Sequence, residues 1–156
     1  MKRSIILGAS AALLVAAMNS HADTEEINSI SHFVITDPGT PYETNTGGKG
    51  VYGQIMHATQ IAADGTLSSH WCIGEVAAAE EGSGGSAGYC TIIFDNGDVL
   101  YTSYIGVGGG QPTAWKVMGG SGEYAGATGS GTSALVSVRA DGEASTVRHT
   151  GTLTTK

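Results

Sequence analysis

Apolar and polar residues alternate in short runs along most of the chain after residue 28, and glycine-containing turns separate the runs. Alternation with a period of two is typical of strands with one buried face. No window outside the N-terminal stretch shows an apolar stripe of helical period and length. The pattern predicts eight or nine strands, over residues 29–36, 51–63, 68–76, 88–95, 99–107, 113–119, 123–129, 132–140 and 143–150.

Three turn signals divide these runs. Asn-Gly at 96–97 and Asp-Gly at 141–142 each lie between two runs of strand-forming residues, and Asp-Gly at 64–65 is a weaker third case. Both central residues of a type I′ turn need positive φ, which Asn, Asp and Gly accept. A two-residue turn at 96–97 places Phe94 opposite Val99. Short strands at this regular spacing predict an all-β barrel or sandwich.

The N-terminus has the pattern of a signal peptide. Lys2 and Arg3 precede an uncharged apolar run at 5–18, and Ser20-His21-Ala22 resembles a small-x-small cleavage site. The run is shorter than the roughly 20 residues of a spanning helix. The alternative is a buried N-terminal helix. We therefore predict a cleaved signal peptide at 1–22, a single barrel domain at 23–156, no membrane span and a periplasmic or secreted location.

Composition narrows the classes of partner. Glycine supplies 25 of 156 residues without a Gly-X-Y period, which excludes collagen. Hydrophobic residues make up 40 %, too many for a disordered acidic chain. The net charge is −7, and loss of Lys2 and Arg3 with the leader takes it to −9. That charge argues against a nucleic-acid partner.

Export also decides how the two cysteines are interpreted. Cys72 and Cys90 are the only cysteines of the chain. An even number in an oxidising compartment predicts one disulfide between them. The alternative is a reactive thiol or a metal-binding pair, but their spacing is not that of a CxxC motif.

A glycine-rich segment, residues 117–131, carries a family resemblance. It has no GK[ST] and no helix pattern after it, so phosphate binding is a poor explanation. It resembles the GGTG-x-[FY]-x-x-A-x-G signature of the allene oxide cyclase-like and dirigent-like barrels, with serine in place of the threonine. The matching residues are Gly119, Gly120, Ser121, Gly122, Tyr124, Ala127 and Gly129, and Gly126 is a further structural glycine.

The resemblance implies an eight-stranded, antiparallel, calycin-like barrel. Plant members of the family are often trimeric and steer cyclisation or radical coupling of small apolar substrates without a metal or organic cofactor. The resemblance therefore implies no cofactor and leaves homo-oligomerisation open. The motif is structural and carries no catalytic residue over, so whether this chain is an enzyme, and through which residues, stays open.

Five residues are candidates for a ligand pocket. The two tryptophans, Trp71 and Trp115, both lie within predicted strands and are the aromatic candidates. Glu75, Arg139 and Arg148 are the polar candidates, because Glu75 shares a strand face with Trp71 and the expected hairpin at 141–142 places both arginines on one strand face. In the alternative interpretation all three charges lie outside the barrel as solubilising groups.

Other chemistry is weakly represented. His32, His57, His70 and His149 are scattered, without HExxH spacing, so we predict no metal site. The leading functional hypothesis is an exported barrel that binds a small, largely apolar molecule, with cyclase or isomerase chemistry as an extension. The alternative is a non-enzymatic structural or interaction module of the cell envelope.

Overall fold

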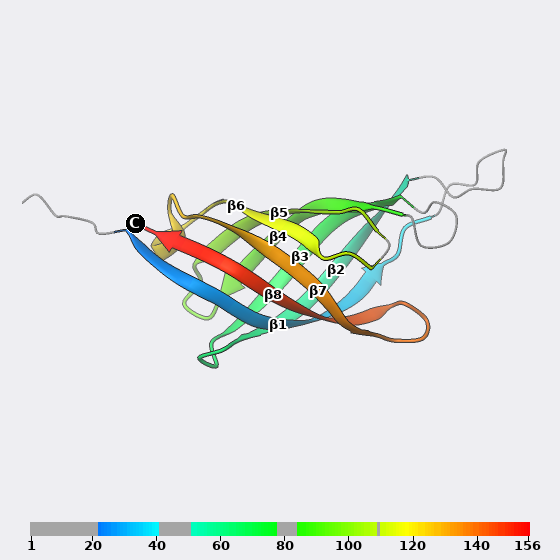
Figure 1. The fold of residues 1–156 in the computed structure, drawn as a ribbon, viewed down its shortest axis with the longest axis horizontal. Helices are drawn as coiled ribbons and strands as arrows, with labels where there is room; N and C mark the ends of the chain where they lie inside the picture. Colours follow the sequence, from blue (N-terminus) through cyan, green and yellow to red (C-terminus); the bar gives the residue numbers. More distant parts are fainter. Residues whose placement is uncertain (1–21, 41–50, 78–83, 109) are drawn as a thin grey trace, which may run out of the picture.

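The computed structural model describes residues 22–40, 51–77, 84–108 and 110–156, which form a barrel of strands (Figure 1). Apart from Ala22, the predicted signal peptide lies outside these residues. Residues 41–50 and 78–83, in two of the connections between strands, also lie outside them. The strands are β1 (Asp23–Asp37), β2 (Val51–Ala62), β3 (Leu67–Ala77), β4 (Ser86–Phe94), β5 (Val99–Gly106), β6 (Thr113–Gly120), β7 (Thr128–Val138) and β8 (Ala144–Thr155).

Each strand pairs antiparallel with its neighbours in the sequence, and β8 pairs with β1 to close the barrel. The predicted eight-stranded antiparallel barrel is therefore confirmed. Closure gives every strand a neighbour on both sides over part of its length, although residues 23–28 of β1 pair with β8 alone and β6 pairs with β7 over only four residues. Because side chains alternate along a strand, one set points into the lumen and the other to the outside. No helix of the described chain is long and apolar enough to cross a membrane.

The two ends of the barrel have different connections (Figure 1). One end holds the start of β1, the end of β8, the β2–β3 and β4–β5 turns, and a short 3-10 turn, η1 (Gly122–Tyr124). The other end holds the β7–β8 hairpin and the remaining loops. We call the first end the acidic mouth, because Asp23, Glu25 and Glu123 lie there.

Three local expectations need correction. Residues 123–129 do not form a strand: the chain turns through η1, and β7 begins only at Thr128. At the β4–β5 hairpin Val99 pairs with Ile93 instead of Phe94. Phe94 N–H donates to the Asp98 carbonyl, so the loop has three residues, with Gly97 in the left-handed region. At the β7–β8 hairpin Ser137 pairs with Thr146, as a two-residue turn at 141–142 predicts, but a register shift between Leu135 and Ser137 places Leu135 opposite Val147 instead of Arg148.

The lumen near the acidic mouth is a hydrophobic core. Its buried residues come from five successive parts of the barrel, and Trp115, Ile27, Phe94 and Tyr124 pack against them. The cluster consists of Ile92, Leu100, Val117, Ala127 and Leu153. Four of these residues occupy inward positions of their strands, and Ala127 directly precedes β7.

Two aromatic rings and four glycines share one level of the lumen. The rings are cross-strand neighbours, and each lies over a pair of glycines on the strands beside it, where a Cβ atom would collide with the ring. In order around the barrel the residues are Gly74, Gly88, Tyr104, Trp115, Gly131 and Gly151. The glycines thus make room for rings that fill the lumen, a use of glycine and aromatic residues known from designed sheets.

The predicted disulfide is present between Cys72 and Cys90. The two residues are direct cross-strand partners on β3 and β4, with Cα atoms 4.1 Å apart. Cys72 is fully buried, so the bond lies inside the barrel wall and contributes to filling the lumen. A disulfide agrees with an oxidising compartment, and the particular compartment stays a prediction.

Candidate functional site

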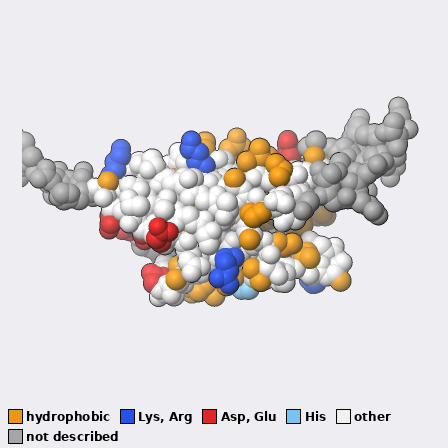
Figure 2. All heavy atoms as spheres, in the orientation of Figure 1, with side chains coloured by type: hydrophobic (Ala, Val, Ile, Leu, Met, Phe, Trp, Pro, Cys, Tyr) orange, Lys and Arg blue, Asp and Glu red, His pale blue; other side chains and the backbone are white. Residues whose placement is uncertain are grey.

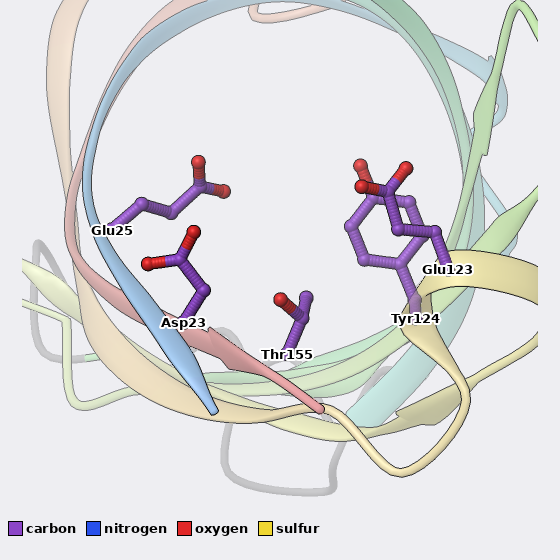
Figure 3. Close-up of a pocket in the computed structure, with 5 residues that line it drawn as sticks. All are labelled: Asp23, Glu25, Glu123, Tyr124 and Thr155. Atoms are coloured by element: carbon purple, nitrogen blue, oxygen red, sulfur yellow. The ribbon is translucent and has the colours of Figure 1, made fainter. Parts of the chain in front are cut away.

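A small cavity of about 120 Å³ opens at the acidic mouth. Figure 3 shows its lining: Asp23 and Glu25 of β1 point inward from one side, Glu123 and Tyr124 of η1 face them, and Thr155 of β8 lies between. Asp23 and Glu25 are two residues apart and therefore share the inward face of β1. Asp23 and Thr155 are cross-strand partners, so barrel closure brings them together.

The glycine motif builds the η1 side of this cavity. Gly122 has φ of +57°, a conformation that a residue with a Cβ atom rarely adopts. This turn lets Ser121 N–H donate to the Val99 carbonyl, at 2.8 Å, and Glu123 N–H donate to the Asp98 carboxylate, at 3.0 Å. Both bonds fix η1 to the β4–β5 hairpin. The segment that carries the family resemblance therefore positions Glu123 and Tyr124 at the mouth.

Tyr124 is held by stacking. Its ring lies on Phe94 with centroids 4.4 Å apart and planes inclined by 20°. Burial raises the pKa of Tyr124 to about 12, and the carboxylates nearby, Glu123 and Glu25 first, act in the same direction. The phenol therefore keeps its proton at any physiological pH and is able to donate a hydrogen bond to a ligand.

Among the carboxyl groups that line the cavity, Glu25 has a shifted pKa. Burial raises the pKa of Glu25, and the negative charges of Asp64, Asp23 and Glu123 raise it further. Both effects disfavour the ionised form. Glu25 thus holds a proton more readily than an isolated glutamate does.

These groups give the mouth a definite chemistry. A ligand there meets one carboxyl with raised proton affinity, one phenol donor and further carboxylates that accept hydrogen bonds and attract cations. Enzymes that use two carboxyl groups for acid–base catalysis typically place them in environments that give them different pKa values. No group of three metal-ligating side chains suited to a metal ion occurs in the described residues, and the mouth carboxylates are not such a group.

The histidines that looked scattered in the sequence form two pairs. His32 and His57 line a shallow, open depression on the outside of β1–β3. His70 and His149 lie in the lumen, with ring centroids 6.2 Å apart, and the ring of Phe33 meets both edge-on. Barrel closure creates this second pair, because it brings β8 within reach of β3 across the lumen.

Each lumen histidine is hydrogen-bonded. His149 Nδ1 lies 2.7 Å from Ser133 Oγ, and its Nε2 lies 2.9 Å from Ser31 Oγ. His70 Nε2 contacts the Gln60 side-chain carbonyl, and the Gln60 amide in turn donates to Ser29. Burial lowers the pKa of His70 to about 3 and that of His149 to about 4. Both rings are therefore neutral near pH 7, and this layer is a satisfied polar part of the interior.

The aromatic candidates from the sequence have different positions. Trp115 lies in the lumen, where its indole N–H donates to the Thr132 carbonyl at 3.2 Å. Trp71 lies on the outside of β3 and is 49 % exposed. Glu75 lies on the same outer face of β3 and is exposed. The structure therefore does not bring these three residues together.

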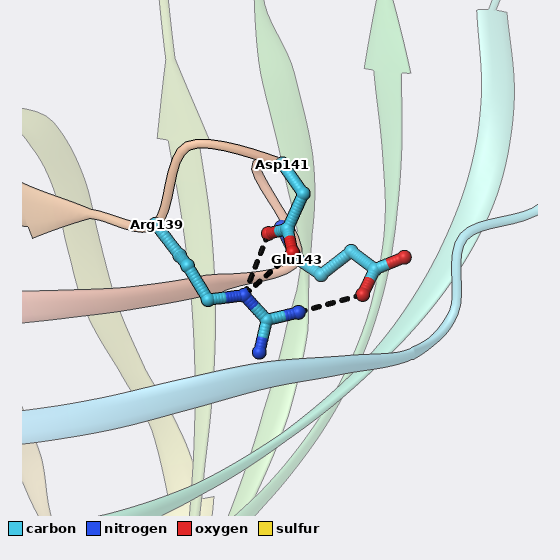
Figure 4. A network of polar contacts seen from close by, with 3 residues as sticks. All are labelled: Arg139, Asp141 and Glu143. Carbon is cyan, nitrogen blue, oxygen red and sulfur yellow. Dashed lines mark hydrogen bonds and ion pairs between the residues drawn. The ribbon is translucent and has the colours of Figure 1, made fainter.

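Both arginine candidates also point outward. Arg139 contacts Asp141 at 2.7 Å and Glu143 at 2.7 Å within the β7–β8 hairpin (Figure 4). All three side chains are about half exposed, and Arg148 is exposed on β8. The interpretation that placed charges outside the barrel therefore describes Glu75, Arg139 and Arg148. Whether any of the five candidates contacts a ligand stays a prediction.

The sequence alone does not reveal the acidic mouth. Asp23 and Glu25 precede the first predicted strand, and their inward alternation with Ile27 was the available signal. Glu123 and Tyr124 lie within the glycine motif, in which Tyr124 holds the aromatic position and Glu123 a variable one. The pairing of β1 with β8 joins residues far apart in the sequence, and no local pattern reveals it.

Comparison with solved structures identifies the fold. Two pterocarpan synthase dirigent proteins, GePTS1 and PsPTS1, match with TM-scores of 0.58 and 0.56 and 16 % sequence identity each. The first match covers 86 % of this chain and 91 % of GePTS1, and the second covers 84 % of this chain and 94 % of PsPTS1. No protein-family profile and no curated protein matches the sequence. The chain has the fold of the dirigent-like barrels, as the glycine motif indicated.

Proposed function

We propose that this barrel binds a small molecule at its acidic mouth and orients or protonates it without a bound cofactor. The observation that carries the proposal is the convergence of Asp23, Glu25, Glu123 and Tyr124 on one cavity. Small-molecule sites typically combine a concave surface with a few convergent polar groups and shifted pKa values. The likeness in fold to proteins named as dirigent proteins supports a substrate-guiding role.

The cavity also defines which part of a ligand it accepts. A volume of about 120 Å³ is well below the roughly 300 Å³ at which pockets for drug-sized ligands begin. Only a polar end group therefore enters, and the carboxylates favour a hydroxyl or a cation there. The stacked rings of Tyr124 and Phe94 offer an apolar wall beside it. The largely apolar ligand predicted from the sequence would thus need a polar or cationic end.

Three probes of one shape test this proposal: tyramine, 4-ethylphenol and 4-hydroxyphenylacetate, measured by ligand-observed NMR. We expect tyramine to bind best and the anionic probe least, because the mouth is negatively charged. Glu25→Gln and Glu123→Gln should each weaken tyramine binding about tenfold, as expected for loss of about 1.4 kcal/mol. Glu26→Gln is the matched control, since Glu26 lies on the outer face of β1. Equal binding of all three probes, or an equal effect of Glu26→Gln, contradicts the proposal.

One observation favours the alternative, a non-enzymatic structural module. Between the two mouths the described lumen is occupied by the hydrophobic core, the Tyr104 and Trp115 rings, the disulfide and the histidine layer. An eight-stranded barrel whose lumen is filled by side chains has little space for a ligand inside it. Failure of every probe at the mouth would make this alternative the better description.

A further inference from the structure

The first residue of the barrel is also the residue that follows the predicted cleavage site. Ser20-His21-Ala22 has the small-x-small pattern that predicts cleavage after Ala22. β1 begins at Asp23, and this first residue already pairs with Thr155 of β8. The pattern of the leader and the pairing of the strands are independent observations. Both place a boundary between Ala22 and Asp23.

Asp23 also belongs to the acidic mouth. Its side chain points into the cavity beside Glu25, and Glu123 lies across from them (Figure 3). Figure 2 shows that most acidic side chains of the visible face lie toward the end of the barrel at which β1 begins. The backbone nitrogen of Asp23 lies about 1.5 Å from its Cα atom. A new charge on this nitrogen would therefore lie at the rim of the cavity.

The surroundings of this nitrogen are mostly negative. The titratable and charged groups on β1, on η1, in the β2–β3 turn and after the end of β8 are Asp23, Glu25, Glu123, Tyr124, Asp64 and Lys156. Four of them are carboxyl groups and one is a neutral phenol. The basic one, Lys156, extends its side chain along Gly126, which lies between η1 and β7. An ammonium group at Asp23 is therefore favoured by the charges around it.

We propose that removal of the leader after Ala22 creates the α-amino group of Asp23 as a binding group of the acidic mouth. Hydrolysis of the Ala22–Asp23 peptide bond by a peptidase consumes one water molecule. It leaves a carboxylate on Ala22 and an amino group on Asp23, which takes a proton from the solvent. In the unprocessed chain the same nitrogen is a neutral amide, so the group exists only after processing.

This inference rests on the proposed function and adds a cation to its site. The processed mouth combines carboxylates, which accept hydrogen bonds, with one fixed ammonium, which donates them. The ammonium suits a hydroxyl, carbonyl or carboxylate oxygen of the ligand. It also repels a cationic ligand, so the processed mouth attracts cations less strongly than its carboxylates alone would.

Two chains isolate the effect of the amino group. One begins at Asp23. The other carries two added glycines before Asp23, which move the amino group about 7 Å along the chain and leave an amide at Asp23. Mass spectrometry of the full chain after export should find Asp23 as the first residue.

An NMR titration of the α-amino group tests its surroundings without a ligand. The ordinary pKa of such a group is about 8, and the carboxylates of the mouth should raise it in the folded chain that begins at Asp23, relative to the same chain in urea. The glycine-extended chain should show no such difference. Glu25→Gln should reduce the difference, whereas Glu26→Gln, on the outer face of β1, should preserve it.

Tyramine binding tests the consequence for a ligand, because its amine stays charged between about pH 7 and about pH 9. In the chain that begins at Asp23, the affinity for tyramine should rise about threefold as the α-amino group loses its proton, because the repulsion between two cations is lost. The glycine-extended chain should bind tyramine about threefold more tightly at pH 7 and show no such rise. Neutral 4-ethylphenol should bind both chains equally.

Three results would each overturn the proposal. They are a first residue other than Asp23 after export, an ordinary α-amino pKa in the folded chain that begins at Asp23, and equal tyramine affinities in two chains that both bind it. If no probe binds either chain, the proposed function fails. The pKa comparison then decides by itself whether the amino group belongs to the acidic mouth.

Discussion

At the residue scale, the two lumen histidines show how burial determines protonation. His70 and His149 face each other and Phe33 in a closed interior, where a charged imidazole loses its hydration. Serine and glutamine partners satisfy the neutral rings, because hydroxyls both donate and accept. The folded state therefore favours the neutral form of both rings.

This layer predicts a stability that depends on pH. The pKa values in the folded state, about 3 for His70 and about 4 for His149, lie below the ordinary value of 6.5. Between these values the unfolded chain binds more protons, so the free energy of unfolding is highest above pH 6.5 and falls as the pH drops toward 3. At 1.36 kcal/mol per pKa unit, His149 alone accounts for roughly 3 kcal/mol.

Urea unfolding between pH 7 and pH 4 measures this loss. His149→Gln should flatten the pH dependence even though it lowers stability at pH 7. His57→Gln, on the exposed outer face of β2, should keep the parental slope. A parental slope in His149→Gln would mean that other groups cause the acid sensitivity.

At the element scale, the glycine motif links β6 to η1 by close backbone contacts. At Gly120 a Cβ atom would collide with the Val99 carbonyl and the Tyr124 side chain, and at Gly122 it would collide with the Asp98 carboxylate. Gly122 also has positive φ, whereas Gly120 does not. Positive φ therefore requires glycine at Gly122, whereas close approach of neighbouring atoms is the reason for glycine at Gly120.

Gly120→Val and Gly122→Val should each lower the free energy of unfolding by about 1–3 kcal/mol. Gly53→Val is the control, because a Cβ atom at Gly53 finds its nearest neighbour 3.8 Å away. Thermal and urea unfolding provide the measurement. If the two motif variants unfold like the Gly53 variant, the motif does not hold η1 in place.

The Cys72–Cys90 disulfide should be present in the folded, mature protein. Non-reducing mass spectrometry should find the chain lighter by two hydrogen atoms than after reduction, and native thiol labelling should find no reactive cysteine. Cys72→Ala with Cys90→Ala should cost about 3 kcal/mol, the usual contribution of a loop of this length. Full thiol labelling of the folded protein would contradict the bond.

The strands were predictable where one face is apolar and the turns are local. Runs such as 88–95 and 99–107 alternate clearly, and Asn96-Gly97 marks the turn between them within one residue of the observed register. The first strand was placed at 29–36 because its earlier inward residues, Asp23 and Glu25, are acidic. Inward carboxylates at a mouth contradict the apolar alternation from which strands are predicted.

At the scale of the whole molecule, closure of the barrel creates the candidate site. Pairing of β1 with β8 joins Asp23 to Thr155, and η1 adds Glu123 and Tyr124 from a third part of the chain. Long-range pairing of this kind leaves no trace in local sequence patterns. For that reason the fold could be predicted from the sequence, whereas the acidic mouth could not.

The most direct test of the acidic mouth is to locate tyramine on the folded protein by amide chemical-shift mapping. The account predicts that the shifts concentrate at the amides of Glu25, Glu123, Tyr124 and Thr155, around the cavity at the start of β1. Shifts centred on Trp71 or on the Arg139 hairpin, or shifts spread evenly over the barrel, would contradict it.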